Sequence, residues 1–180
     1  MDYATARQQI QDGDLIAILG KRGLLAPLTR YFTRTPEPHT GIAIWLGEDL
    51  WMAELNGGHN HLIPLAQYSG ADFDVYYPPV PNRSEVRQAT LDTLRGLIPY
   101  SLAALVVVGL LNWLRIKIYV HARREMVCSG YCVLIYEQAG WPERSRIISP
   151  HELAIQLVKR LEVRATEKPA EAGFFLGDRP

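Results

Sequence analysis

Cysteine is scarce in this chain: only two of the 180 residues are cysteines, Cys128 and Cys132, four positions apart. Such a pair excludes the disulfide framework on which small secreted domains depend. The cysteines and histidines also lack the spacing of zinc ligands. We therefore predict a protein that needs no metal and no organic cofactor.

An excess of charge of either sign is missing as well. Nineteen basic and nineteen acidic residues cancel, so the net charge gives no reason to expect binding to nucleic acid or to an anionic membrane. Residues 1–14 are polar and do not contain the apolar segment of a signal peptide. We expect a cytoplasmic protein, with association with a phage particle or with a membrane surface as alternatives. The sequence predicts no oligomeric state.

Apolar runs separated by turn residues predict one domain, residues 1–165, that contains both strands and helices. The clearest feature is a hairpin of two apolar strands, residues 39–46 and 50–55, joined by a turn at 47–49. Further strands are expected at 14–19, 61–65 and 73–77, and helices at 3–11, 22–33, 83–98, 127–139 and 150–161.

The last of these helices has a favourable start. Ser149, Pro150 and Glu152 stand where a serine cap, a proline and a glutamate stabilise the first turn of a helix. Beyond it, residues 166–180 are rich in Glu, Ala, Pro and Gly, and we expect them to form a flexible tail.

One long apolar run, residues 97–114, allows two interpretations. A helix that spans a membrane needs about 20 apolar residues. This run is shorter, contains Pro99 and Asn112, and is followed directly by Arg115 and Lys117. We interpret it as a helix buried inside the domain, with a helix that contacts a membrane as the alternative.

Cys128 stands at the head of an apolar segment of helical length. The backbone amides and the positive end of a helix dipole favour a thiolate at such a position. A thiolate nucleophile also needs a base, and the base needs a group that orients it. The amide of Cys128 is a candidate donor to the oxyanion of a tetrahedral intermediate.

The predicted hairpin supplies both partners. A turn near Gly47 places His39 and Glu54 at the open end of the hairpin, close to opposite each other, where side chains on one face lie about 5 Å apart. A carboxylate inside an otherwise apolar strand needs a partner. Cysteine, histidine and glutamate then repeat the logic of a Ser-His-Asp triad. His61 is the alternative base.

Several short motifs, spread over residues 13–153, resemble the circularly permuted papain-fold enzymes of the NlpC superfamily, in particular the YiiX/YebB-like group. The motifs are GDLI at 13–16, HTGIAI at 39–44, WMAE at 51–54, VCSGY at 127–131 and ISPHEL at 148–153. In this group the histidine precedes the cysteine, as it does here. One position departs from the pattern, because Gly130 stands where the group usually has a glutamate.

The resemblance implies an α+β, papain-like fold, in which a small antiparallel sheet packs against helices that include the one carrying Cys128. It also implies a cysteine peptidase or amidase with Cys128, His39 and Glu54 as catalytic residues. The substrate would be a peptide or another amide, and a bacterial cell-wall peptide is one candidate. Two alternatives remain: a thioesterase or acyltransferase that acts on lipid esters, and a binding or virion-structural module without catalysis.

For the remaining candidate residues we expect structural roles rather than catalytic ones. Cys132 lies among apolar residues, and we expect it in the core. His59 and His121 are expected on the surface, and Asp14 at a solvated strand start or near the site. Tyr100 and Trp45 are expected to pack, with lining of a pocket as the alternative.

Overall fold

The structure is a computed structural model that describes residues 1–19, 39–56, 58–114, 126–142 and 149–165. The expected helix at 22–33, the expected tail at 166–180 and His121 lie outside the described residues.

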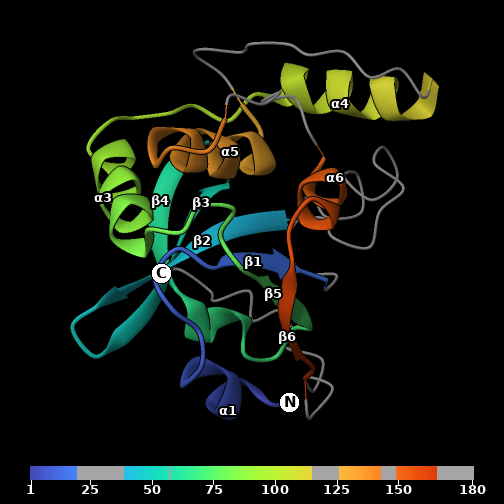
Figure 1. Ribbon diagram of the computed structural model, residues 1–180. Coiled ribbons are helices and arrows are strands. Elements are labelled where there is room, and N and C mark those ends of the chain that lie inside the picture. Colours follow the sequence, from blue (N-terminus) through green and yellow to red (C-terminus); the bar gives the residue numbers. More distant parts are fainter. Residues whose placement is uncertain (20–38, 57, 115–125, 143–148, 166–180) are drawn as a thin grey trace, which may run out of the picture.

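The described part is an α+β structure built on a six-stranded sheet in which all neighbouring strands are antiparallel (Figure 1). The strand order is β4-β3-β2-β1-β5-β6. The strands are β1 (Leu15–Ile18), β2 (His39–Leu46), β3 (Asp49–Asn56), β4 (His59–Pro64), β5 (Phe73–Tyr76) and β6 (Lys159–Val163).

Helices cover both faces of this sheet. On one face lie α3 (Arg83–Leu94), α5 (Cys128–Gln138) and α6 (Pro150–Ile155), with a core that includes Leu15, Ala53 and Tyr131. The other face is covered by α1 (Tyr3–Arg7) and a short 3-10 helix, η1 (Leu65–Tyr68), around a second core. The two cores arise because successive residues of each strand point to opposite faces.

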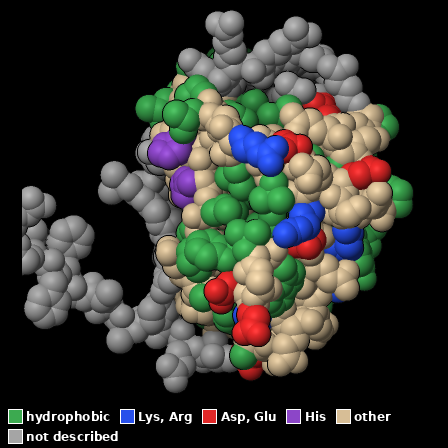
Figure 2. All heavy atoms as spheres, turned by 90° about the vertical axis from the view of Figure 1, so that its left-hand side faces the viewer, with side chains coloured by type: hydrophobic (Ala, Val, Ile, Leu, Met, Phe, Trp, Pro, Cys, Tyr) green, Lys and Arg blue, Asp and Glu red, His purple; other side chains and the backbone are tan. Residues whose placement is uncertain are grey.

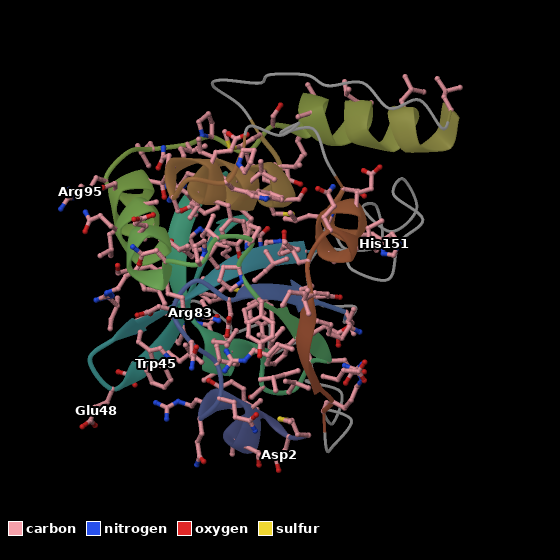
Figure 3. All side chains as sticks on the ribbon, viewed as in Figure 1. Asp2, Trp45, Glu48, Arg83, Arg95 and His151 are labelled. Carbon is pink, nitrogen blue, oxygen red and sulfur yellow. The ribbon has the colours of Figure 1, made fainter. Side chains whose placement is uncertain are left out.

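The expected hairpin is present as β2 and β3. Leu46 pairs with Asp49 around a two-residue turn in which Gly47 has a φ of 63°, and Gly41 pairs with Glu54. The turn residue Glu48 lies at the far end of the two strands from this Gly41–Glu54 pair (Figure 3). His39 and Glu54 are therefore diagonal neighbours rather than directly opposite, because the residue opposite Glu54 is Gly41.

Three helix predictions are wrong in extent. The helix at 3–11 ends at Arg7, the helix at 83–98 ends at Leu94, and the helix at 150–161 ends at Ile155. Residues 159–163 instead form β6, which pairs with β5 and buries the alternating Leu161 and Val163. The predicted cap is confirmed, because Ser149 and Glu152 form a reciprocal capping box at the start of α6.

The prediction of a buried helix at 97–114 is wrong. Helix α4 (Leu102–Leu114) stands apart from the sheet beyond α5 (Figure 1) and exposes several large apolar side chains. Its first turn is attached, because Ala104 packs with Tyr100 and Val127. None of the helices in the described part of the chain has both the length and the apolar content needed to cross a bilayer.

Charges of both signs are mixed on the face shown in Figure 2, as expected for a chain without net charge. Asp14 is one of the charged residues that do not lie on the surface: it is completely buried and contacts Arg83 and Arg160. The interpretation of Asp14 as a solvated strand start is therefore wrong. It lies beside the end of β1 that pairs with Ile42, whereas His39 pairs with Ile18 at the other end.

Candidate active site

Cys128 is the first residue of α5 and directly follows Val127, whose backbone is extended. The helix packs across β2 and β3, which brings its N-terminus close to the strand residues His39 and Thr40. Cys128 is buried but retains 4% of its exposure, whereas Cys132, one turn later, has none. The expectation that Cys132 belongs to the core is confirmed.

His39, the first residue of β2, lies between the thiol and the carboxylate. Its Nε2 atom is 2.7 Å from Oε2 of Glu54, and the ring also hydrogen-bonds with Cys128. Because Glu54 occupies Nε2, Nδ1 is the ring nitrogen that remains for the thiol. The structure thus brings the three predicted residues together in the order Cys128, His39, Glu54.

The surroundings of Cys128 and His39 favour the charged forms of both side chains, a thiolate and an imidazolium. Burial alone would disfavour both charges, but the mutual hydrogen bond and attraction outweigh it. His39 holds the pKa of the Cys128 thiol below its usual value, with help from the amide and hydroxyl of Thr40. Burial also opposes the charge on His39, yet Cys128 and Glu54 raise its pKa to about 10.

Glu54 is almost completely buried, and several donors surround its carboxylate. Burial would raise its pKa, but His39, the hydroxyl of Tyr68 and the ring of His61 together hold the pKa below its usual value. Tyr68 donates to Oε2 at 2.9 Å, and Nε2 of His61 lies 3.2 Å from Oε1. The side-chain amide of Asn56 is 3.5 Å from Oε1. The carboxylate is therefore held in place and kept ionised.

His61, the alternative base, contacts Glu54 rather than the thiol. Its Nδ1 atom faces the carbonyl oxygen of His59 at 3.0 Å, and its Nε2 faces Glu54. Both ring nitrogens thus face oxygen atoms, and neither has a described contact with the thiol. His39 fits the role of base better than His61. His59 is exposed, as expected, and its ring centre lies 5.9 Å from that of His61.

Sequence reasoning missed two residues at this site, Thr40 and Tyr68. Thr40 neighbours a predicted site residue, but a threonine in an apolar strand carries no signal of its own. Tyr68 lies in η1, fourteen residues after Glu54, and no spacing rule connects the two. Only the path of the chain through β4 brings Tyr68 back to the carboxylate.

The aromatic candidates differ in their relation to the site. Burial raises the pKa of Tyr100, and the charge of Cys128 adds to this effect, so Tyr100 lies near the thiol. Trp45 lies at the turn end of the hairpin (Figure 3), where its indole N–H donates to the carbonyl of Ile10 and Arg7 covers its ring. Trp45 therefore packs, as expected.

The described residues contain no group of three or more His, Cys, Asp or Glu side chains arranged to hold a metal ion. His39 instead contacts both Glu54 and Cys128. The arrangement has the parts of a nucleophile, a base and an orienting carboxylate.

Comparisons with known proteins identify the fold. No protein-family model matches the chain, and no curated protein matches its sequence. Among solved structures, the chain is similar to the crystal structure of the metalloprotein YiiX from Escherichia coli O157:H7, with a TM-score of 0.62 and 15% sequence identity. The match covers 87% of this chain and 99% of YiiX. The chain therefore has a YiiX-like α+β fold, in agreement with the group that its motifs resemble.

Proposed function

We propose that this protein is a cysteine hydrolase of the peptidase or amidase kind, with Cys128 as nucleophile, His39 as base and Glu54 as the residue that orients His39. The observation that carries the proposal is the hydrogen-bonded series of thiol, imidazole and buried carboxylate. His39 and Glu54 come from the consecutive strands β2 and β3, whereas Cys128 comes from α5, much later in the sequence.

The reaction would proceed through an acyl-enzyme. The thiolate of Cys128 attacks the carbonyl carbon, and the carbonyl electrons move to its oxygen, where the amide of Cys128 at the helix start is a donor. The tetrahedral intermediate collapses, and the imidazolium of His39 gives its proton to the leaving nitrogen. A water molecule, deprotonated by His39, then attacks the thioester and releases the acid. Glu54 keeps the ring oriented throughout and stabilises its positive charge.

The proposal includes membership of the permuted papain-like enzymes of the NlpC superfamily. Support comes from the order of the residues, with His39 and Glu54 on strands that precede the Cys128 helix, and from the fold shared with YiiX. A cell-wall peptide is a natural candidate substrate for such an enzyme, alongside other amides.

YiiX is called a metalloprotein, and a metal does not fit the site of this chain. His39 uses Nε2 on Glu54 and its other nitrogen on Cys128. His61 is likewise engaged at both nitrogens. Among the described residues no cluster of ligands is free to converge on one ion. We therefore derive no step that depends on a metal.

A second candidate function, a thioesterase or acyltransferase acting on lipid esters, is favoured by one observation. The exposed apolar side of α4 begins close to the thiol, because Ala104 in its first turn packs against Val127, the neighbour of Cys128. The catalytic steps would be the same, with an oxygen or sulfur leaving group in place of nitrogen.

The first test is the pH dependence of alkylation by iodoacetamide, followed separately for Cys128 and Cys132 by mass spectrometry. We expect Cys128 to react near pH 6, because its pKa is lowered, whereas an ordinary thiol reacts above about pH 8. Cys132 should stay unreactive, because burial raises its pKa. His39→Gln should abolish the reactivity of Cys128 near pH 6.

His59→Gln is the matched control, since it makes the same replacement at an exposed histidine that no described contact joins to Glu54. It should leave the pH profile of Cys128 unchanged. If Cys128 of the native protein reacted only above about pH 8, the catalytic proposal would be wrong. A binding or structural role on the same fold would then be the better account.

A further inference from the structure

Helix α4 carries a row of exposed apolar side chains along one side. Leu102, Val106, Leu110 and Leu114 follow one another at intervals of four residues and are 59%, 54%, 50% and 47% exposed. Residues at this spacing lie on one side of a helix. Ala104 lies about 200° around the axis from Leu102 and about 160° from Val106, and it packs against the body of the protein. The helix is thus attached by one side and presents leucine and valine to solvent on the other.

The chemistry of this row fits the surface of a bilayer. The sequence of α4 contains no charged residue. A helix of 13 residues is about 20 Å long, which is too short for a hydrocarbon core of about 30 Å. Such a helix can therefore lie on a membrane with its apolar side in the boundary between headgroups and acyl chains.

The amino-acid sequence that follows α4 indicates that the lipids would be anionic. Residues 115–125 contain Arg115, Lys117, Arg123 and Arg124 and a single acidic residue, Glu125. The chain as a whole is neutral, so this basic excess is local and directly adjoins the apolar helix. Basic residues next to an apolar helix attract anionic headgroups, at about 1 kcal/mol for each Lys or Arg near the surface.

A second copy of the chain fits this surface less well. The exposed part of the four side chains amounts to a few hundred Å² at most, the size of the largest apolar patch on a typical monomer, which is often functional. A stable protein interface needs about 800 Å² from each partner. The row on α4 alone is therefore too small to hold a dimer, whereas a bilayer sets no such minimum.

We propose that α4 docks this protein on the surface of an anionic membrane through Leu102, Val106, Leu110 and Leu114. Docking would hold the N-terminus of α5 close to the lipid, because the first turn of α4 packs against Val127. Membrane docking does not depend on the proposed hydrolysis, and Cys128→Ser should bind membranes as the native protein does.

The test is co-sedimentation of the full chain with vesicles. One set contains equal parts of phosphatidylglycerol and phosphatidylcholine, and the other contains phosphatidylcholine alone. We expect binding to the anionic vesicles, weakened by added salt, and little binding to the neutral ones. The double variant Val106→Glu, Leu110→Glu should lower the partition coefficient by at least about tenfold.

A matched control places the same charges on exposed apolar residues elsewhere. Ile155 and Val158 are 68% and 69% exposed, and Ile155→Glu with Val158→Glu should bind vesicles like the native protein. Circular dichroism checks that each variant is folded, and Leu110→Ser provides a milder change at the same place. Failure of the native protein to bind, or equal binding to both lipids, would overturn the proposal. So would a dimer in light scattering that the α4 variant dissociates.

Discussion

At the scale of single residues, Glu54 has the most constrained environment in the candidate site. Its carboxylate is nearly inaccessible to solvent and faces His39, Tyr68 and His61. A buried carboxylate without partners would take up a proton, but here the donors keep its pKa low. The negative charge therefore remains available to stabilise an imidazolium at His39, which in turn stabilises the thiolate of Cys128.

Glu54→Gln tests this effect of the carboxylate on His39 and Cys128, because glutamine removes the negative charge and keeps the size of the side chain. Without the carboxylate, His39 should lose its proton at a lower pH than the present value of about 10. A neutral His39 no longer favours the thiolate, so the pKa of Cys128 should rise. We expect the midpoint of Cys128 alkylation to move upward by roughly one pH unit, since one unit corresponds to about 1.4 kcal/mol of lost interaction.

Glu48→Gln is the matched control, because Glu48 is an exposed glutamate in the turn of the same hairpin (Figure 3). It should leave the alkylation midpoint in place. Equal midpoints for Glu54→Gln and the native protein would show that the carboxylate does not act on the thiol through His39.

At the scale of the elements, the β2–β3 hairpin positions the site, and Gly41 makes its geometry possible. Gly41 pairs with Glu54 and follows His39 by two positions on the same strand. A Cβ atom at Gly41 would lie 2.6 Å from Cγ of Met52 and 2.8 Å from the carbonyl oxygen of Ala53. Both distances are below van der Waals contact, and the second involves backbone that cannot rotate away.

Gly41→Ala should therefore destabilise the protein by about 1–3 kcal/mol, the usual cost of overpacking a core, as measured by urea unfolding. It should also weaken the reactivity of Cys128 near pH 6, because the strands that carry His39 and Glu54 must shift. Gly96→Ala is the control: the nearest atom to its Cβ would be 3.9 Å away. A Gly41→Ala variant as stable as Gly96→Ala would contradict the packing argument.

The hairpin is also the element that the sequence predicts best. Two apolar strands around Gly47 predict an antiparallel hairpin, and such a hairpin places His39 and Glu54 at the same open end. The helix of Cys128 and the capping box at Ser149 follow equally from local patterns, since caps and apolar runs act over a few residues. The diagonal placement of His39 and Glu54 does not follow, because it depends on a two-residue turn that the sequence does not fix.

The predictions for residues 97–114 and 159–161 are wrong for a common reason. Leu161 and Val163 become a strand because the edge of β5 offers them partners, and α4 is exposed because the core is already filled by α3, α5 and α6. Both outcomes depend on what the rest of the chain leaves available. Local propensity says little about either.

At the scale of the whole molecule, one ion network connects the two ends of the described chain. Asp14 precedes β1 and is fully buried; Arg83 at the start of α3 and Arg160 in β6 contact its two oxygens at 2.7 and 2.5 Å. Both guanidinium groups also lie over the ring of Tyr77. The N-terminal strand, the first long helix and the C-terminal strand therefore meet at one carboxylate.

Burial should make this network far more sensitive to substitution than an exposed pair of the same length. Removing one partner from a buried pair leaves charge without compensation, whereas an exposed pair is screened by water and contributes little. Asp92 and Arg95 form such an exposed pair, also at 2.7 Å, in which Asp92 is 46% exposed. The two aspartates thus differ in burial and in the number of arginines that contact them.

We expect Asp14→Asn to lower the free energy of unfolding by about 3 kcal/mol, and Asp92→Asn to change it by less than about 0.5 kcal/mol, both measured by urea denaturation. The loss at Asp14 should appear in a single cooperative transition, because the network joins β1, α3 and β6 into one unit. A separate early transition of β6 would show that the C-terminal strand is held independently. Equal effects at the two aspartates would mean that burial does not decide the strength of this network.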